Sequence, residues 1–170
     1  MAITIKEVTK QHKRKAFDCG EPALNAYLQQ HARQAGERNI AKTYVACQDT
    51  TPLDMLGYYS LTGYSVTIPP DHPYYQRYPH PLTAVKLVRL ATDKTQQRRG
   101  IGELLLFDAI MQTTRVADQI GAIGLYVDPM TPGLMSYYES YGFLPSQPAN
   151  AEQLEMWLPL ATCLEVIEYT

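Results

Sequence analysis

Residues 97–102 (Gln-Arg-Arg-Gly-Ile-Gly) constrain the fold of this chain more than any other segment. They follow an apolar strand pattern at Ala84–Ala91 and open the longest helical pattern, Gly100–Ile120. This order is typical of α/β proteins, in which the helix covers the apolar face of a sheet. The first N–H groups of a helix lack partners within it, and glycines let a phosphate approach them. With Arg98 and Arg99 adding positive charge, the segment predicts a pyrophosphate cradle, although ordinary turns show the same pattern.

Two other phosphate loops do not fit this segment. A Walker loop requires Lys and then Ser or Thr after its second glycine, where this chain has Glu103 and Leu104. A Rossmann fingerprint requires a third glycine three residues further on, where Leu105 stands. Both of these classes of nucleotide-binding protein are therefore excluded.

The other patterns mix strands with helices. Alternation and apolar runs predict strands at Ile3–Val8, Thr43–Gln48, Met55–Val66, Ala122–Val127 and Glu155–Leu160. Helical spacing predicts one helix from Pro22 to a stop at Gly36, with His31 on its apolar face, and a short helix from Thr131 towards Gly142. Five prolines between residues 69 and 81 predict a loop. We expect a mixed α/β fold in one domain over residues 1–170.

Composition excludes several classes of protein. The chain has 170 residues, 45% of them hydrophobic and 19% charged, which excludes a disordered polymer. No stretch approaches the ~18 apolar residues of a membrane span, and the N-terminus does not read as a signal peptide. Cys19, Cys47 and Cys163 lack metal-ligand spacing and fit reduced thiols, so we expect a cytoplasmic protein without a metal.

The charge is unevenly distributed along the chain. Residues 1–115 carry 15 basic and 10 acidic side chains, whereas residues 116–170 carry seven acids and no Lys or Arg. Such asymmetry indicates an anionic partner for the basic part, or simply charge that keeps the protein in solution.

A second segment, residues 136–143 (Ser-Tyr-Tyr-Glu-Ser-Tyr-Gly-Phe), lies on the short helix and at its end. A phenol is protonated at neutral pH and can give a proton to a leaving thiolate. The alternative is a core aromatic at helical spacing, and with three tyrosines in five positions at least one is expected to pack.

Together, the two segments resemble the GNAT superfamily of N-acetyltransferases. The resemblance implies the GNAT acyltransferase fold, a central mixed twisted sheet flanked by helices, with acetyl-CoA as co-substrate. It assigns Tyr138 as the general acid and Tyr137 as a packing aromatic beside it. Close relatives often have glycine at the position of Arg98, so the first turn of the cradle is expected to differ here. The acetyl-CoA residues implied by the resemblance are Leu90, Ala91 and Thr92 for the pantetheine arm and Gln97, Arg98, Arg99, Gly100, Ile101 and Gly102 for the pyrophosphate.

Residues 17–34 narrow the resemblance to the GNAT toxins of type II toxin–antitoxin systems. They contain Phe-Asp-Cys-Gly and then Ala-Leu-Asn-x-Tyr-Leu, and the similarity continues to about residue 162. Such toxins acetylate the α-amino group of aminoacyl-tRNA and thereby block translation. The resemblance also implies a ribbon–helix–helix antitoxin, operator DNA bound only through that antitoxin, and a homodimer.

An RNA substrate gives the basic residues a candidate partner. The residues predicted to contact tRNA are Lys13, Arg14, Lys15, Arg33, Arg38, Lys42, Lys86 and Arg89. A solvated turn is the alternative for residues 13–15. Two other functions stay open: a GNAT enzyme acting on a small amine or a protein N-terminus, and a non-catalytic module acting through an antitoxin–DNA complex.

Overall fold

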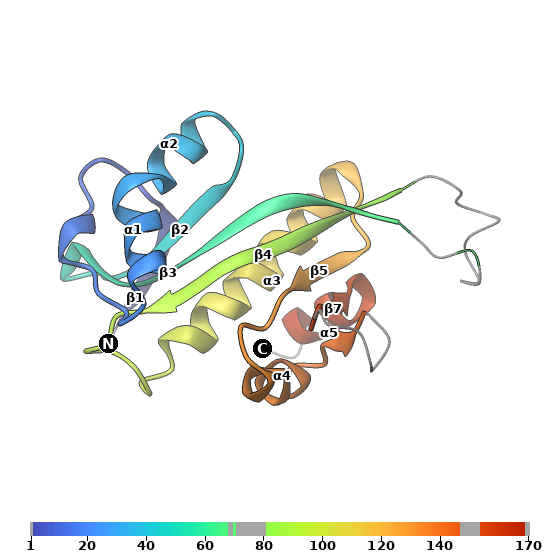
Figure 1. Ribbon diagram of the computed structural model, residues 1–170. Coiled ribbons are helices and arrows are strands. Elements are labelled where there is room, and N and C mark those ends of the chain that lie inside the picture. The colour runs from blue at the N-terminus through green and yellow to red at the C-terminus, as the bar shows by residue number, and fades with distance from the viewer. Residues whose placement is uncertain (1, 68–69, 71–80, 147–153, 169–170) are drawn as a thin grey trace. The chain divides into compact units, whose positions relative to one another are not determined.

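The computed structural model describes residues 2–67, 70, 81–146 and 154–168. They form a mixed sheet with the strand order β1-β2-β3-β4-β5-β7-β6 (Figure 1). The strands are β1 (Ile3–Glu7), β2 (Lys42–Gln48), β3 (Thr51–Val66), β4 (Leu82–Thr92), β5 (Gly124–Val127), β6 (Leu144–Pro145) and β7 (Met156–Pro159). The helices are η1 (Arg14–Ala16), α1 (Pro22–Gln30), α2 (Ala32–Glu37), α3 (Ile101–Ile120), α4 (Pro132–Glu139) and α5 (Leu160–Glu168).

The chain divides into two compact units. Unit 1 comprises residues 1–62 and 87–109, and unit 2 comprises residues 63–86 and 110–170. Strands β3 and β4 and helix α3 each contribute to both units. The prediction of one domain over residues 1–170 stays a prediction.

Unit 1 is built on the antiparallel strands β1, β2 and β3, with α1 and α2 beside them (Figure 1). Its core joins Leu28 and Ala32 of the helices to Val45 of β2 and Tyr58 of β3, and all four are at most 1% exposed. Phe17 packs edge-on against Tyr58, with the ring centroids 5.5 Å apart. The segment that leads into α1 is thereby fixed on the sheet.

The prediction of a single helix after Pro22 is wrong, because α1 and α2 are separate helices that meet at His31. The backbone of His31 leaves the helical region (φ −124°), and the residue is exposed, with its ring centroid 6.3 Å from that of Tyr27. Helical spacing continues through the break because the N–H of His31 still bonds to Tyr27 and its carbonyl to Ala35, both at 2.9 Å. Periodicity alone therefore predicted one continuous element.

Unit 2 is centred on the antiparallel pair β5 and β7, along which α5 packs (Figure 1). A Cβ at Gly124 would lie 2.3 Å from the carbonyl oxygen of Leu158, so the two strands approach closely at this residue. The strand predicted to reach Leu160 ends at Pro159, and the helix α5 that follows was not predicted. Among the described residues, no helix has the length and apolar content needed to cross a bilayer.

Candidate functional site

The loop at residues 93–100 and the start of α3 carry the predicted cradle, within unit 1. The first helical hydrogen bond joins the N–H of Leu104 to the carbonyl of Gly100 at 3.1 Å. The N–H groups before Leu104 therefore have no acceptor inside the helix, and they lie at its positive end. Gly100 has a φ of +82°, a conformation that glycine adopts without strain.

Arg98 adopts a backbone conformation that normally favours glycine, with a φ of +66°. Close relatives often have glycine at this position, and the Arg98 backbone takes a conformation that glycine also adopts. The difference from those relatives therefore lies in the side chain. Arg98 and Arg99 are exposed, and within the described residues neither forms an ion pair. Both guanidinium groups are thus free to meet an anionic ligand.

The three residues predicted to line the pantetheine arm form the end of β4. Leu90 and Thr92 are half-buried and Ala91 is buried. The N–H of Asp93 donates to the carbonyl of Leu56 at 2.9 Å, which keeps the end of β4 against β3. Gly57 of β3 packs so tightly that an added Cβ would lie 2.8 Å from the Ala91 carbonyl oxygen.

Gln97 has a contact that its predicted role did not include. Its side-chain Nε2 donates to the carbonyl oxygens of Cys19 and Thr92, at 3.3 and 3.4 Å. The side chain therefore ties the loop to the segment before α1 and to the end of β4. Only the backbone of Gln97 stays a candidate for contact with a phosphate.

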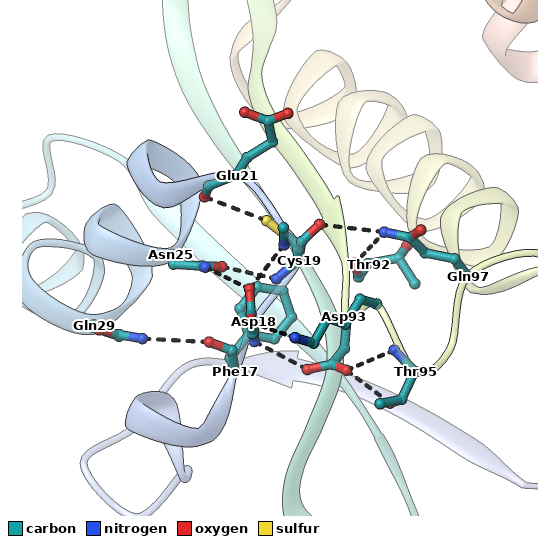
Figure 2. A network of polar contacts seen from close by, with 12 residues as sticks. Phe17, Asp18, Cys19, Glu21, Asn25, Gln29, Thr92, Asp93, Thr95 and Gln97 are labelled. Carbon is teal, nitrogen blue, oxygen red and sulfur yellow. Dashed lines mark hydrogen bonds and ion pairs between the residues drawn. The ribbon is translucent and has the colours of Figure 1, made fainter.

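Residues 18–25 and 93–97 form a polar network around the stem of this loop (Figure 2). Asp18, Asn25, Asp93 and Lys94 are its centre, and the site prediction contained none of them. The motif Phe-Asp-Cys-Gly followed by Asn was visible in the sequence as a family signature. Its spacing said nothing of the loop, which lies more than 70 residues further along the chain.

Tyr138 lies near the end of α4, in unit 2, and is 6% exposed. Its ring packs edge-on against Phe143 and Tyr137, with centroid separations of 5.4 and 5.3 Å. Burial raises the pKa of Tyr138 to about 12, so its hydroxyl keeps its proton at neutral pH. Within the described part of the chain this hydroxyl has no hydrogen-bond partner, which leaves it able to donate to a ligand.

The basic residues predicted to contact tRNA lie in different surroundings. Lys15 and Arg38 are exposed, and Lys13, Arg33 and Lys42 pair with exposed or half-exposed carboxylates. The guanidinium of Arg89 lies over the ring of Tyr27, 3.5 Å from its centroid, and is held there by a cation–π contact. A cleft of about 480 Å³ is lined by Lys10, Lys13, Arg14, Lys15, Gln29 and their neighbours.

Lys86 differs from the other predicted phosphate ligands. Its side chain is 15% exposed, and its Nζ pairs with Asp128 at 2.9 Å and Glu155 at 3.3 Å. Burial alone lowers the pKa of Lys86, but the two carboxylates outweigh it and the pKa is raised. Glu155 also accepts hydrogen bonds from Tyr64 and Ser146. The positive charge of Lys86 is thus neutralised inside unit 2.

The cysteines offer no second chemistry. All three are free and buried, and burial raises the pKa of Cys47 to about 11 and of Cys163 to about 12. In the residues that the structure describes, no group of three His, Cys, Asp or Glu side chains is placed to hold a metal ion. Most of the proline-rich segment, with Tyr74, Tyr75 and Tyr78, lies outside the described residues.

Comparison with known proteins identifies the family. No protein-family model matches the chain. A tRNA-acetylating toxin of Mycobacterium tuberculosis is 32% identical over 130 residues, which cover 75% of this chain and 76% of that protein. The chain belongs to the tRNA-acetylating toxins. A probable toxin TacT of Sinorhizobium fredii is 27% identical over 162 residues, 89% of this chain and 87% of that protein.

Solved structures agree with this membership. AtaT complexed with acetyl-methionyl-tRNAfMet is 28% identical, with a TM-score of 0.84 over 99% of both chains. A tyrosine-to-phenylalanine variant of AtaT, bound to the C-terminus of the antitoxin AtaR and to acetyl-CoA, is 26% identical, with a TM-score of 0.82 over 98% of this chain and 99% of that one. The KacTA–DNA complex is 26% identical, with a TM-score of 0.80 over 99% of both chains. The predicted GNAT toxin family, mixed α/β fold and acetyltransferase class are confirmed.

Proposed function

We propose that this chain transfers the acetyl group of acetyl-CoA to the α-amino group of an amino acid esterified to tRNA. The observation that carries the proposal is the start of α3, where the N–H groups before Leu104 have no acceptor inside the helix, in a chain of the tRNA-acetylating toxin family. Acetylation removes the nucleophilic amine that forms the next peptide bond, so translation stops. We assign this activity to one GNAT domain over residues 1–170, acting in the cytoplasm where tRNA is charged.

The end of β4 and the start of α3 fit acetyl-CoA. The N–H groups up to residue 103, which have no acceptor inside the helix, and the exposed Arg98 and Arg99 match a pyrophosphate in charge and hydrogen-bonding capacity. Backbone groups of Leu90, Ala91 and Thr92 are assigned to the pantetheine arm and to polarising the acetyl carbonyl. Acetyl-CoA supplies the activated acetyl group, and these residues hold and orient it.

Tyr138 is assigned as the general acid. When the amine nitrogen bonds to the acetyl carbon and the carbon–sulfur bond breaks, the departing sulfur takes the phenol proton. The surplus proton of the amine returns to the phenolate through water, so one proton moves from nitrogen to sulfur and Tyr138 ends unchanged. The α-amine of the substrate titrates at a pKa of about 8, so part of it is neutral at physiological pH without a protein base.

We assign tRNA binding to basic residues of unit 1. The cleft lined by Lys13, Arg14 and Lys15 offers several cations to neighbouring phosphates. Arg89, fixed over Tyr27 and directly before Leu90 in β4, is the candidate for the acceptor end. Arg33 and Arg38 extend this set, whereas the paired Lys86 is assigned a structural role.

We also propose an antitoxin partner of the ribbon–helix–helix type, with operator DNA bound through that partner, and a homodimer. The solved complexes of AtaT with AtaR and of KacTA with DNA support an antitoxin partner and DNA binding. The excess of acidic residues after residue 115 suits a basic antitoxin segment.

The deciding experiment incubates the protein with labelled acetyl-CoA and a pool of charged tRNAs, then identifies the acetylated amino acid. The proposal expects label on the α-amine of aminoacyl-tRNA and arrest of cell-free translation. Transfer to small amines or a protein N-terminus without RNA would replace it with a different acetyltransferase. Acetyl-CoA binding without any transfer would indicate a non-catalytic module instead.

A further inference from the structure

We propose that Asp18 and Lys94 are positioning residues for acetyl-CoA, because their ion pair fixes the loop whose N–H groups receive the pyrophosphate. Asn25 and Gln97 complete this anchor (Figure 2). The inference rests on the proposed function, since it assigns the loop to acetyl-CoA. It adds a role for Asp18, Asn25 and Lys94, which make no predicted contact with either substrate.

The first half of the anchor holds the turn before α1. The Asp18 carboxylate accepts hydrogen bonds from the N–H of Gly20 and from Nδ2 of Asn25, both at 2.9 Å. The Asn25 side-chain oxygen accepts from the N–H of Cys19, also at 2.9 Å. Because Asn25 lies in the first turn of α1, the turn and the helix are connected through both ends of this amide.

The second half attaches the loop to that turn. Lys94 pairs with Asp18 through its Nζ at 3.0 Å, and its N–H donates to the Asp18 carbonyl at 2.8 Å. The Asp93 carboxylate accepts from the N–H groups of Asp18 at 3.1 Å and Thr95 at 3.0 Å. Gln97 also bonds to the Cys19 carbonyl. The contacts between the loop and the turn therefore extend from Asp93 to Gln97.

A loop of this conformation needs such an anchor. Arg98 follows the anchored residues directly and holds a φ of +66°, which a residue with a side chain keeps only where the surrounding structure imposes it. Residues 97–100 are exposed, so packing does not impose it. The Lys94 ammonium and the hydrogen bonds from Gly20 and Asn25 stabilise the charged carboxylate of Asp18 and lower its pKa to about 2. A preformed loop binds its ligand more tightly because less ordering is required on binding.

The competing explanation is that Lys94 binds a phosphate of acetyl-CoA directly. The two explanations give opposite results for Asp18→Asn. If Lys94 binds phosphate, removing its carboxylate partner leaves affinity unchanged or increases it. If the pair positions the loop, Asp18→Asn and Lys94→Gln weaken binding alike, and the double variant is no weaker than either single variant.

The test measures acetyl-CoA affinity by calorimetry for the full chain and these three variants. Asp54→Asn is the matched control, because Asp54 pairs with Lys13 at 3.1 Å with side-chain exposures of 50% and 62%, against 44% and 62% for Asp18 and Lys94. We expect about fivefold weaker binding in both single variants, restoration by Lys94→Arg, and no change in the control. In turnover, KM for acetyl-CoA rises while kcat at saturation stays within about twofold.

Wild-type affinity in both Asp18→Asn and Lys94→Gln, or tighter binding in Asp18→Asn, overturns the inference. Full additivity in the double variant also overturns it. Lys94→Gln changes an exposed side chain, so it reports on the loop even if Asp18→Asn disturbs folding. If the wild-type protein binds acetyl-CoA but does not acetylate aminoacyl-tRNA, the proposed function fails while the affinity series still decides the inference. If the wild-type protein does not bind acetyl-CoA, both are overturned.

Discussion

Gly57 gives the sharpest test of how β4, whose end is proposed to line acetyl-CoA, is packed. It lies in β3, and a Cβ added there would come within 2.8 Å of the Ala91 carbonyl oxygen and of Leu105 Cδ1, and within 3.2 Å of Ile101 Cγ2. These three neighbours are at most 6% exposed, so none can move into solvent. Gly57→Ala therefore forces β4 and the start of α3 away from β3. Overpacking of this kind costs about 2 kcal/mol of unfolding free energy, which lowers Tm by about 4–8 °C in a chain of this size.

The assay compares urea unfolding and acetyl-CoA affinity for Gly57→Ala and Gly63→Ala. Gly63 lies in the same strand, but no described atom comes within 4 Å of its added Cβ. The control is expected to be neutral or slightly stabilising, by about 0.5 kcal/mol, because alanine restricts the unfolded chain. Gly57→Ala is also expected to weaken acetyl-CoA binding, since Ala91 and Ile101 both belong to the proposed site. Equal stability of the two variants would refute the packing explanation.

Three further predictions address separate roles. Tyr138→Phe is expected to lower the transfer rate about 10²–10⁴-fold with little change in acetyl-CoA affinity. In the wild-type protein, the rate is expected to rise with pH as the substrate amine loses its proton. Because the pKa of the Tyr138 phenol is raised to about 12, deprotonation of Tyr138 should not lower the rate below about pH 10. Full activity in this variant contradicts the assignment. Lys86→Met is expected to cost about 3 kcal/mol in urea unfolding, because it leaves Glu155 buried without its cation; weaker tRNA binding at unchanged stability would contradict this. Lys15→Glu is expected to weaken tRNA binding and reduce its salt slope by about one, whereas Arg115→Glu, exposed and outside the proposed set, leaves the slope unchanged.

Local sequence patterns predicted those helices and strands whose sequence signals lie within their own residues. The strand pattern at Ala84–Ala91 and the helical pattern at Gly100–Ile120 correspond to β4 and α3 within two residues at each end. Helix α5 was missed because it begins directly after β7 without a capping residue. The N–H of Leu160, its first residue, bonds to the carbonyl of Ile123, so the chain is still in the sheet where the helix begins.

The site divides in the same way. The proposed cradle could be located in the sequence because its glycines and arginines are consecutive, and the proposed proton donor because its helix carries a family motif. The contacts around the cradle were not, because Asp18 and Lys94 are 76 residues apart and each taken alone is an ordinary surface charge. The ion pair of Lys86 was not predictable for the same reason, since its partner Glu155 lies 69 residues further on.

The uneven charge of the sequence follows the division of the chain into two units. Unit 1 contains 12 basic and 9 acidic residues, and unit 2 contains three and eight. One of the three cations of unit 2 is Lys86, whose charge is neutralised by Asp128 and Glu155. The positive charge that can attract a polyanion is therefore concentrated in unit 1. The same unit contains the loop proposed for acetyl-CoA. An RNA attracted by unit 1 would therefore be drawn to the unit in which the acetyl donor is proposed to bind, and the net charge of −2 is no obstacle to that attraction.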